Sequence, residues 1–349
     1  MPVTPARRRP LADELAVRTR SCADLTELAD AVCAAFRTAV PYRFGCLATT
    51  DPSTGLISWA HKTHPLEIGD EEFAAAEYGG WDVNQFAEIA TRDEPVGVLS
   101  HDTQGRPEAC RRFRNFLTPR FGFSDELRVV FRAQGLTWGA LALYRGDGDA
   151  SFTADDARTA AGVHAQVADL LRTALFNPPR GASQAAPGPA VIVVDGEDRV
   201  LNMTAAARRR IEDLGGWDHG SLPPPVLVAT AAARCTPERA NNRAVGRDGA
   251  WLVVRATTFT AEGNGSGDDV VVTIDAASAA DMSGLALAAR GLSPREQELA
   301  GLVLQGVATR AIVEKLHLSP HTVQDHLKSI FAKLGVNSRR EMVQQLVLD

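Results

Sequence analysis

Residues 292–346 read LSPREQELAGLVLQGVATRAIVEKLHLSPHTVQDHLKSIFAKLGVNSRREMVQQL, and this stretch carries the clearest structural signals in the chain. Ser293 and Glu296 have the S-x-x-E spacing of a capping box, and Pro294 stands where a first helical turn tolerates proline. Apolar residues then recur at helical spacing as far as Gly306, which can take the left-handed conformation that ends a helix. A helix is therefore predicted between these signals.

The same stretch predicts three further helices. The second runs from Thr309 to Leu316, and the third runs from Pro320 to Leu334. A second capping box at Ser338 and Glu341 opens the fourth. We therefore expect an all-α, four-helix domain over residues 291–349.

The third of these helices has two chemically different faces. At about 100° per residue, four apolar side chains fall within about 40° of one another and form a narrow stripe that we expect to be buried. The stripe consists of Val323, Leu327, Ile330 and Leu334. Polar side chains with hydrogen-bonding reach lie opposite, as the major groove of DNA requires. An ordinary solvated face is the alternative, and the angular pattern alone does not separate the two.

Many spaced residues of this stretch match one known pattern. They are Leu292-Ser293-Pro294-Arg295-Glu296, Gly306, Ile312, Leu316-His317-Leu318-Ser319, Thr322-Val323, His326, Ile330 and Lys333-Leu334. With these matches the segment resembles the LuxR-type (NarL/FixJ-type) helix-turn-helix domain. The resemblance implies that the helix 320–334 docks in the major groove of double-stranded operator DNA, while the preceding helix crosses the backbone.

The resemblance also implies roles for individual residues. The implied base-edge contacts are Gln324, Asp325 and Lys328. The implied phosphate or sugar contacts are Arg310, His321, Thr322, Lys333 and Arg339. The fourth helix would give a homodimer surface through Met342, Val343, Leu346 and Val347.

Three residues depart from the family pattern. His317 replaces a usual glycine, although histidine tolerates the left-handed region better than most residues. Val313 replaces a small alanine and can change how closely two helices pack. Asp325 brings a negative charge to the groove, which is unfavourable near phosphates unless the carboxylate accepts from a cytosine amino group.

Length and charge set limits on the rest of the chain. The 349 residues suggest two or three domains. The net charge is -6, but the residues from Arg290 onward hold eight Lys or Arg against six Asp or Glu, so this tail is near +2 and the remainder near -8. Because the basic excess is small, a monomer should bind DNA weakly and dimerisation should matter.

Several kinds of site have no signal in the sequence. The five cysteines are widely spaced without a C-x-x-C, which fits a reducing cytoplasm and indicates no recognisable zinc site. No signal peptide or transmembrane stretch is evident, so we expect a cytoplasmic protein with no membrane partner. The P-loop, H-E-x-x-H and G-x-S-x-G patterns are missing, so we expect no catalytic residue, metal or cofactor.

Residues 24–176 show an α+β pattern. The expected helices and strands are a helix at 23–40, strands at 44–50 and 56–60, a helix at 71–78, an irregular region through 122, strands at 127–132 and 136–144, and a helix at 155–176. With Gly139 in a G-x-L-x-L strand and Phe152 opening an F-[ST]-x-x-D helix start, this half resembles a GAF domain. The resemblance implies a sensory domain with an antiparallel sheet and flanking helices.

Two features of this half bear on binding. GAF domains bury small ligands between sheet and loops, which makes six aromatic residues candidate pocket liners: Trp59, Trp81, Phe86, Phe113, Phe116 and Trp138. Ordinary core packing is the alternative for each. The last helix also carries a heptad-like stripe that predicts a dimer seam, or else packs on its own sheet: Ala160, Val163, Val167, Leu170 and Ala174.

A linker rich in proline and glycine occupies residues 177–189. After it, strands at 190–194 and 199–201, a helix at 204–214, and strands at 251–259 and 270–274 resemble a PAS domain over 188–276. Thr204 stands where that family commonly has asparagine. Residues 277–290 would link this domain to the DNA reader.

These observations favour a cytoplasmic, dimeric transcription regulator that is not an enzyme. Its two α+β sensory domains would respond to a small ligand or a protein partner and control the helix-turn-helix domain. RNA polymerase would be a further partner. Two alternatives stay open: a scaffold whose sensory domains bind only protein, and an enzyme fused to a DNA-targeting tail.

Overall fold

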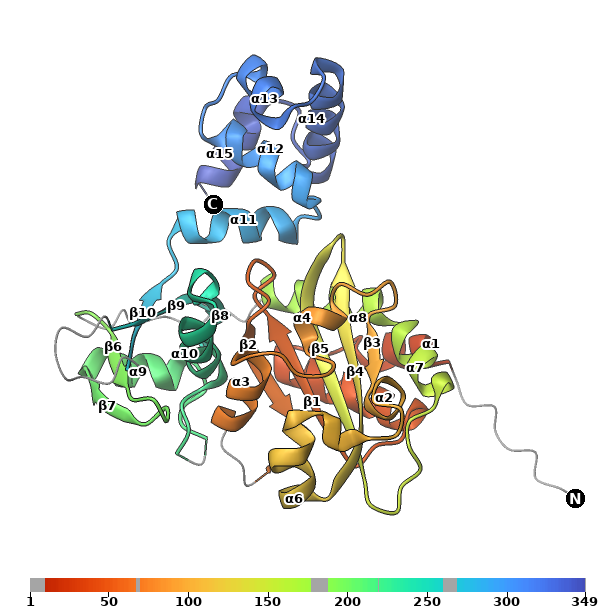
Figure 1. The fold of residues 1–349 in the computed structure, drawn as a ribbon. Coiled ribbons are helices and arrows are strands. Elements are labelled where there is room, and N and C mark those ends of the chain that lie inside the picture. Colours follow the sequence, from red (N-terminus) through yellow and green to blue (C-terminus); the bar gives the residue numbers. More distant parts are fainter. Residues whose placement is uncertain (1–9, 67–69, 177–187, 219, 260–268, 349) are drawn as a thin grey trace, which may run out of the picture. The chain divides into compact units, whose positions relative to one another are not determined.

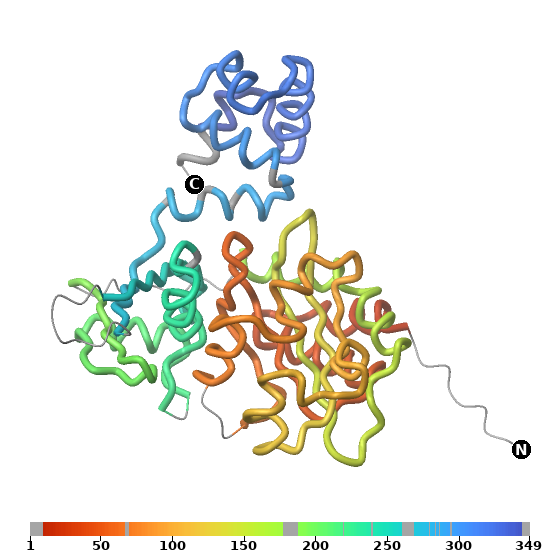
Figure 2. Tube along the Cα trace, in the orientation of Figure 1, coloured from red at the N-terminus to blue at the C-terminus, as the bar shows by residue number. Residues whose placement is uncertain are grey.

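The computed structural model describes residues 10–66, 70–176, 188–218, 220–259 and 269–348 (Figure 1). The chain divides after Ala276 into two compact units. The first unit holds two antiparallel five-stranded sheets with their helices, and the second is helical. Figure 2 traces the path of the chain through both sheets into the helical unit.

The first sheet has the strand order β2-β1-β5-β4-β3. Its strands are β1 (Phe44–Thr50), β2 (Ile57–Lys62), β3 (Val96–Val98), β4 (Phe123–Ala133) and β5 (Leu136–Gly146). Its longer helices are α1 (Leu11–Arg18), α2 (Leu25–Ala39), α3 (Asp70–Tyr78), α7 (Ala154–Ala161) and α8 (His164–Phe176). Short helices connect them: α4 (Phe86–Ile89), α5 (Leu99–Asp102) and α6 (Thr118–Phe121).

Most of the expected strands and helices of this half are present, with two differences. The region expected to be irregular contains the short helices α4, α5 and α6 and the edge strand β3, whose three residues are too few to show an alternating pattern. The long helix expected over 155–176 is broken into α7 and α8 between Ala161 and His164. Asp24 caps the start of α2 by accepting from the Glu27 amide at 2.8 Å.

The apolar stripe predicted as a dimer seam runs from α7 into α8 and packs largely inside the chain. Ala160, Val163 and Val167 are buried, and α8 packs against β4. Gly139 of β5 also lies close to α8, because a Cβ at that position would lie 2.5 Å from Leu171 Cδ1. The dimer seam predicted for these three side chains is therefore wrong, since the fold uses them in its own core. Leu170, from the same stripe, is half-buried.

The second sheet has the order β7-β6-β10-β9-β8. Its strands are β6 (Val191–Val194), β7 (Val200–Met203), β8 (Asn241–Val245), β9 (Trp251–Thr258) and β10 (Val270–Ala276), and its helices are α9 (Ala205–Asp213) and α10 (Pro224–Cys235). If the five strands of each sheet are numbered 1 to 5 along the chain, both sheets have the spatial order 2-1-5-4-3. Thr204 caps α9 by accepting from the Ala207 amide at 3.2 Å.

Most of the predicted linker 177–189 lies outside the described residues. Between the expected helix 204–214 and the expected strand 251–259, the structure adds α10 and β8, which the sequence pattern did not predict. Nine consecutive residues of α10, Pro225 to Ala233, are buried, so the helix has no polar face that would reveal its period.

One cluster of buried apolar residues includes members from both sheets of the first unit. Helix α10 packs against α3 and β2 as well as against β9. Polar contacts flank this core. The buried Asp51 carboxylate accepts from Arg243 Nε at 2.9 Å and from the Arg243 amide at 3.0 Å. Asn242 donates from its side-chain amide to the Ile57 carbonyl at 2.7 Å.

The second unit contains α11 (Ala279–Ala289), α12 (Pro294–Leu304), α13 (Thr309–Leu316), α14 (Pro320–Leu334) and α15 (Arg339–Leu348). The last four correspond to the helices that the sequence predicts. The segment 277–290 was expected to be a linker, but most of it is α11. Leu287 of α11 lies in the apolar core of this unit together with Leu292, Leu299 and Val323.

Glu296 connects α12 to α14. Its buried carboxylate accepts from the Ser293 amide at 2.7 Å, from Ser329 Oγ at 2.6 Å and from Lys333 Nζ at 2.6 Å. Burial opposes its ionisation, but the hydrogen bonds from Lys333, Ser329 and Ser293 prevail and lower the pKa of Glu296 to about 2. The capping box predicted from sequence is thus also a brace between two helices.

We expect Glu296→Gln to destabilise the helical unit by about 1–3 kcal/mol at pH 7. Because the folded pKa lies below the ordinary value of 4.5, the stabilisation is complete above that pH and is lost as the pH falls toward 2. The difference from wild type should therefore shrink at pH 3. This difference in stability is measured by urea unfolding of the full chain, with hydrogen exchange of the α12 and α14 amides as the probe.

Glu298→Gln is the matched control. Glu298 lies in the same helix, is half exposed and pairs only across the surface with Arg295, so its loss should change the unfolding midpoint little. Equal effects of the two substitutions, or an undiminished Glu296 effect at pH 3, would contradict the proposed brace.

Candidate functional site

Helix α14 has the two faces that its sequence predicts. The four side chains of the apolar stripe are buried, the most exposed at 7%. Gln324, Asp325 and Lys328 are exposed. Ser319 caps the helix by accepting from the Thr322 amide at 3.0 Å. The helix is thus fixed by its apolar side and offers an amide, a carboxylate and an ammonium on its surface.

Asp325 lies between two basic side chains of the same helix. Its Oδ2 atom is 3.0 Å from His321 Nδ1, and its Oδ1 atom is 3.9 Å from Lys328 Nζ. All three side chains are more than half exposed, so these contacts are weak and screened by solvent. The carboxylate that would repel phosphates is therefore partly compensated by its own neighbours.

The residues expected to contact the DNA backbone fall into two groups. Arg310 and His321 are strongly exposed, and Arg310 Nε lies 3.6 Å from Glu314 Oε1. Thr322, Lys333 and Arg339 already have partners inside the domain. The Thr322 hydroxyl lies 2.8 Å from Ser319 Oγ, and Lys333 pairs with Glu296 as described above.

Arg339 is held by the C-terminal end of α12. Its Nη2 atom donates to the Val307 carbonyl at 2.6 Å and approaches the Val303 carbonyl at 3.4 Å. A guanidinium at a helix C-terminus satisfies free carbonyls and matches the helix dipole. The contacts of Lys333 and Arg339 with phosphate stay predictions, and each would have to share its cation with an internal partner.

The departures from the family pattern also have visible consequences. His317 ends α13 in the left-handed region, with φ of 52°.

Met342 of α15 is fully buried in the core of its own unit, so it is not free to form the expected dimer surface. Val343 is half-buried against the same core, and the side chains of Leu346 and Val347 lie outside the described residues.

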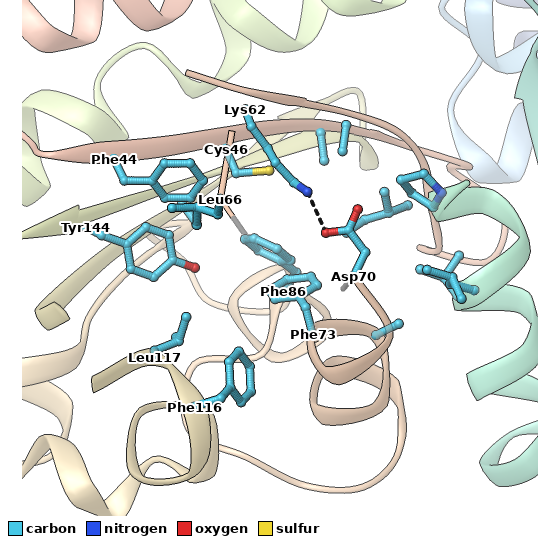
Figure 3. Close-up of a pocket in the computed structure, with 18 residues that line it drawn as sticks. Phe44, Cys46, Lys62, Leu66, Asp70, Phe73, Phe86, Phe116, Leu117 and Tyr144 are labelled. Carbon is cyan, nitrogen blue, oxygen red and sulfur yellow. Dashed lines mark ion pairs between the residues drawn. The ribbon is translucent and has the colours of Figure 1, made fainter. Parts of the chain in front are cut away.

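The first unit contains a cavity of about 70 Å³ on one face of its first sheet (Figure 3). Phe44, Cys46 and Tyr144 approach it from the strands, and Phe73 approaches it from α3. The walls are nearly all apolar. Helix α10 completes the lining with Pro224, Leu227 and Val228.

The six aromatic residues predicted to line a pocket have different surroundings. Phe86 and Phe116 line this cavity, and Phe113 packs on Tyr144 with 6.3 Å between ring centroids. Trp59 borders a wider cleft of about 640 Å³ in the same unit. Trp138 is buried edge-on against Phe176.

Trp81, in contrast, is 74% exposed and lines no interior surface. Gly79 and Gly80, which precede it, form a bend. An aromatic side chain by itself does not show whether a residue is buried. Lys62 and Asp70 were missed by the sequence reasoning, although their side chains form an ion pair of 2.9 Å at the cavity. They come from β2 and α3, and only the fold brings them together.

A buried network of charged residues lies within the first sheet's domain. Arg112 contacts Asp82 at 2.9 Å and Glu126 at 3.0 Å, and Arg128 contacts Glu77 at 2.7 Å. Burial opposes ionisation of Asp82 and Glu126, yet the arginines lower the pKa of both carboxyls. Since each of these charges is paired, the network suits a structural brace.

No group of three or more His, Cys, Asp or Glu side chains in the described residues could hold a metal ion. None of the helices within the described ranges is long and apolar enough to cross a membrane.

The helical unit is similar in sequence to parts of several known proteins. NreC of Staphylococcus aureus, named an oxygen regulatory protein, is 42% identical over 53 residues, which are 15% of this chain and 24% of NreC. A monoamine regulon transcriptional regulator of Klebsiella aerogenes is 39% identical over 54 residues, 16% of this chain and 24% of that protein. Rv0890c of Mycobacterium tuberculosis, whose name describes an HTH-type transcriptional regulator, is 41% identical over 54 residues, 16% of this chain and 6% of Rv0890c. The matches thus span a quarter or less of these relatives.

A solved structure of the Vibrio cholerae VqmA dimer, described among LuxR-type receptors, aligns with 47% of this chain and 84% of that chain at 20% identity. The TM-score of this alignment is 0.21, so it is not evidence that the two chains share a fold. Residues 290–346 match the family described as bacterial regulatory proteins, luxR family. With the four helices and the exposed face of α14 in place, the C-terminal unit of this chain is a helix-turn-helix domain of the luxR family of bacterial regulatory proteins.

Proposed function

We propose that the whole protein is a transcription regulator that binds operator DNA as a homodimer and responds to a signal received by its first unit. One observation carries this proposal: α14 buries one complete side and leaves Gln324, Asp325 and Lys328 exposed on the other. A helix of this kind can enter the major groove and reach base edges. Arg310 and His321, both strongly exposed, would contact the backbone beside it.

The first unit supplies the sensory part of the proposal. We infer that its first sheet belongs to a GAF-like domain and its second to a PAS-like domain, with boundaries near 24–176 and 188–276. The shared strand order and the apolar cavity against the first sheet support this inference. A small ligand would bind in that cavity, and a protein partner is the other possible signal.

Homodimerisation is proposed on electrostatic grounds. The small basic excess of the tail, near +2, gives one copy few phosphate contacts, whereas two linked copies add theirs on adjacent half-sites. We place the regulator in the cytoplasm, with RNA polymerase as a further partner. The rival functions are a protein-only scaffold and an enzyme fused to a DNA-targeting tail, and neither has a specific observation in its favour.

The direct test is DNA-affinity sequencing with the purified full chain and fragmented bacterial genomic DNA. A regulator should enrich a small number of sequences with a common two-fold pattern. Enrichment of no sequence above random DNA, in a folded protein, would reject the proposed function. The enriched site then serves as the operator in the following measurements.

Lys328→Ala should weaken operator binding by about 1–3 kcal/mol and change binding to random DNA little, because a base contact discriminates between sequences. Gln324→Ala should behave in the same way. Arg310→Ala should instead weaken both kinds of DNA about equally, because a phosphate contact carries no sequence information. Titration of labelled operator and random duplexes at fixed salt measures each variant.

Lys315→Ala controls for the loss of a positive charge, because Lys315 is an exposed lysine on α13 outside the proposed contacts. Losses of equal size on operator and random DNA for Lys328→Ala would rule out its role in base readout.

Asp325→Asn should strengthen binding to random DNA several-fold and reduce the preference for operator. The substitution removes a negative charge near phosphates, releases His321 and Lys328, and replaces one of the two carboxylate oxygens by an NH2 donor, which weakens acceptance from a cytosine amino group. The ratio of operator to random affinity is the quantity to compare. Glu314→Gln changes net charge identically on α13 and should leave that ratio unchanged; a similar change of the ratio in both variants would show that Asp325 acts only through charge.

A further inference from the structure

The cavity against the first sheet has walls from both sheets of the first unit. Phe44 and Ala142 contribute from the first sheet, and Leu227 and Val228 contribute from α10, which belongs to the second. Figure 3 shows the aromatic side chains of the first sheet's domain gathered around it. Without α10 this space would be an open groove, so the second sheet's domain completes the site.

The chemistry of the walls limits what can bind. Of the described residues that line the cavity, Lys62 and Asp70 carry charge, and they pair with each other at 2.9 Å. Lys62 Nζ also lies 3.2 Å from Asp218 Oδ2, a residue that precedes α10. An added anion would meet two carboxylates, and an added cation would have to displace Lys62. A neutral molecule leaves this set of charges intact.

The size of the space sets a second limit. An apolar cavity of about 150 Å³ takes benzene, whereas this one has about 70 Å³. The wild-type walls therefore admit a molecule smaller than a full aromatic ring unless a wall moves. Strand β8 of the second sheet, to which α10 belongs, is attached to the first sheet by Arg243, which bonds to Asp51, and by Asn242, which bonds to the Ile57 carbonyl.

We propose that this cavity binds a small, neutral, apolar molecule, and that α10 acts as its outer wall, so that an occupied cavity holds the two sheets of the first unit together. The proposal rests on the sensory role proposed above and states its physical form. A ligand that touches both sheets binds only their assembled state, and it stabilises that state by mass action. Helix α10 is then the element through which occupancy of the first sheet's cavity acts on the second sheet.

The wall can be tested without the natural ligand by enlarging the cavity from α10. Leu227→Ala in the full chain removes side-chain atoms that line the space, so the enlarged cavity should accept benzene. Saturating benzene should raise the melting temperature of this variant by about 2–5 °C and that of wild type by less. It should also slow amide exchange several-fold in both α10 and β2.

Leu252→Ala is the matched control. Leu252 lies on β9, is as buried as Leu227 and belongs to the same apolar core, but it does not line this cavity. The substitution is chemically identical and makes a separate, smaller void. Benzene should therefore stabilise Leu227→Ala more than Leu252→Ala; equal stabilisation would overturn the assignment of the cavity and its wall.

Two further outcomes decide the rest. Benzoate, which adds a carboxylate to the ring, should not stabilise Leu227→Ala, and a shift as large as that with benzene would overturn the preference for neutral molecules. Slower exchange in β2 with no change in α10 would overturn the role of α10 as a wall. None of these measurements involves DNA. Failure here would leave the proposed DNA binding standing, and failure to enrich an operator would leave the cavity result standing.

Discussion

The orientation of α14 depends on one carboxylate. Glu296 receives hydrogen bonds from the start of α12 and from Ser329 and Lys333 on α14, so the same group that caps one helix sets the position of the next. The apolar stripe of α14 fixes which side faces inward, but apolar contacts are not directional. The ion pair with Lys333 adds the direction. A polar face can read DNA only if its helix is held in one orientation, and this brace provides it.

The first unit also contains buried ion pairs. Five charged side chains are buried between its sheet and the loops that cover it, and arginines pair with the carboxylates among them. Removing one partner would leave a buried charge without compensation, which costs far more than the pair itself contributes. The Tyr144 hydroxyl also lowers the pKa of the Glu126 carboxyl, so a residue that lines the cavity acts on the charged network.

The sequence predicted the helical unit well because its signals are local. Ser293, Pro320 and Gly335 mark helix ends through their own chemistry, and the structure has helix ends beside each. It did not predict α10, because a helix that is buried all round has no period to detect. It also missed the pairing of Lys62 with Asp70, since that ion pair depends on how distant segments meet. It placed Trp81 inside because an aromatic side chain by itself does not show whether a residue is buried. The break between α7 and α8 was missed because the apolar stripe continues through it.

The shared core of the two sheets has a consequence for how the molecule can be divided. Ile57 on the first sheet and Ala244 on the second belong to one apolar cluster, so a cut between residues 176 and 188 would leave each half with a large water-exposed apolar surface. Such surfaces make a fragment prone to aggregation. Although the sequence there looks like a natural boundary, the two halves are expected to remain soluble only when produced together, and a cut after Ala276 is the physically safer choice for preparing the sensory unit.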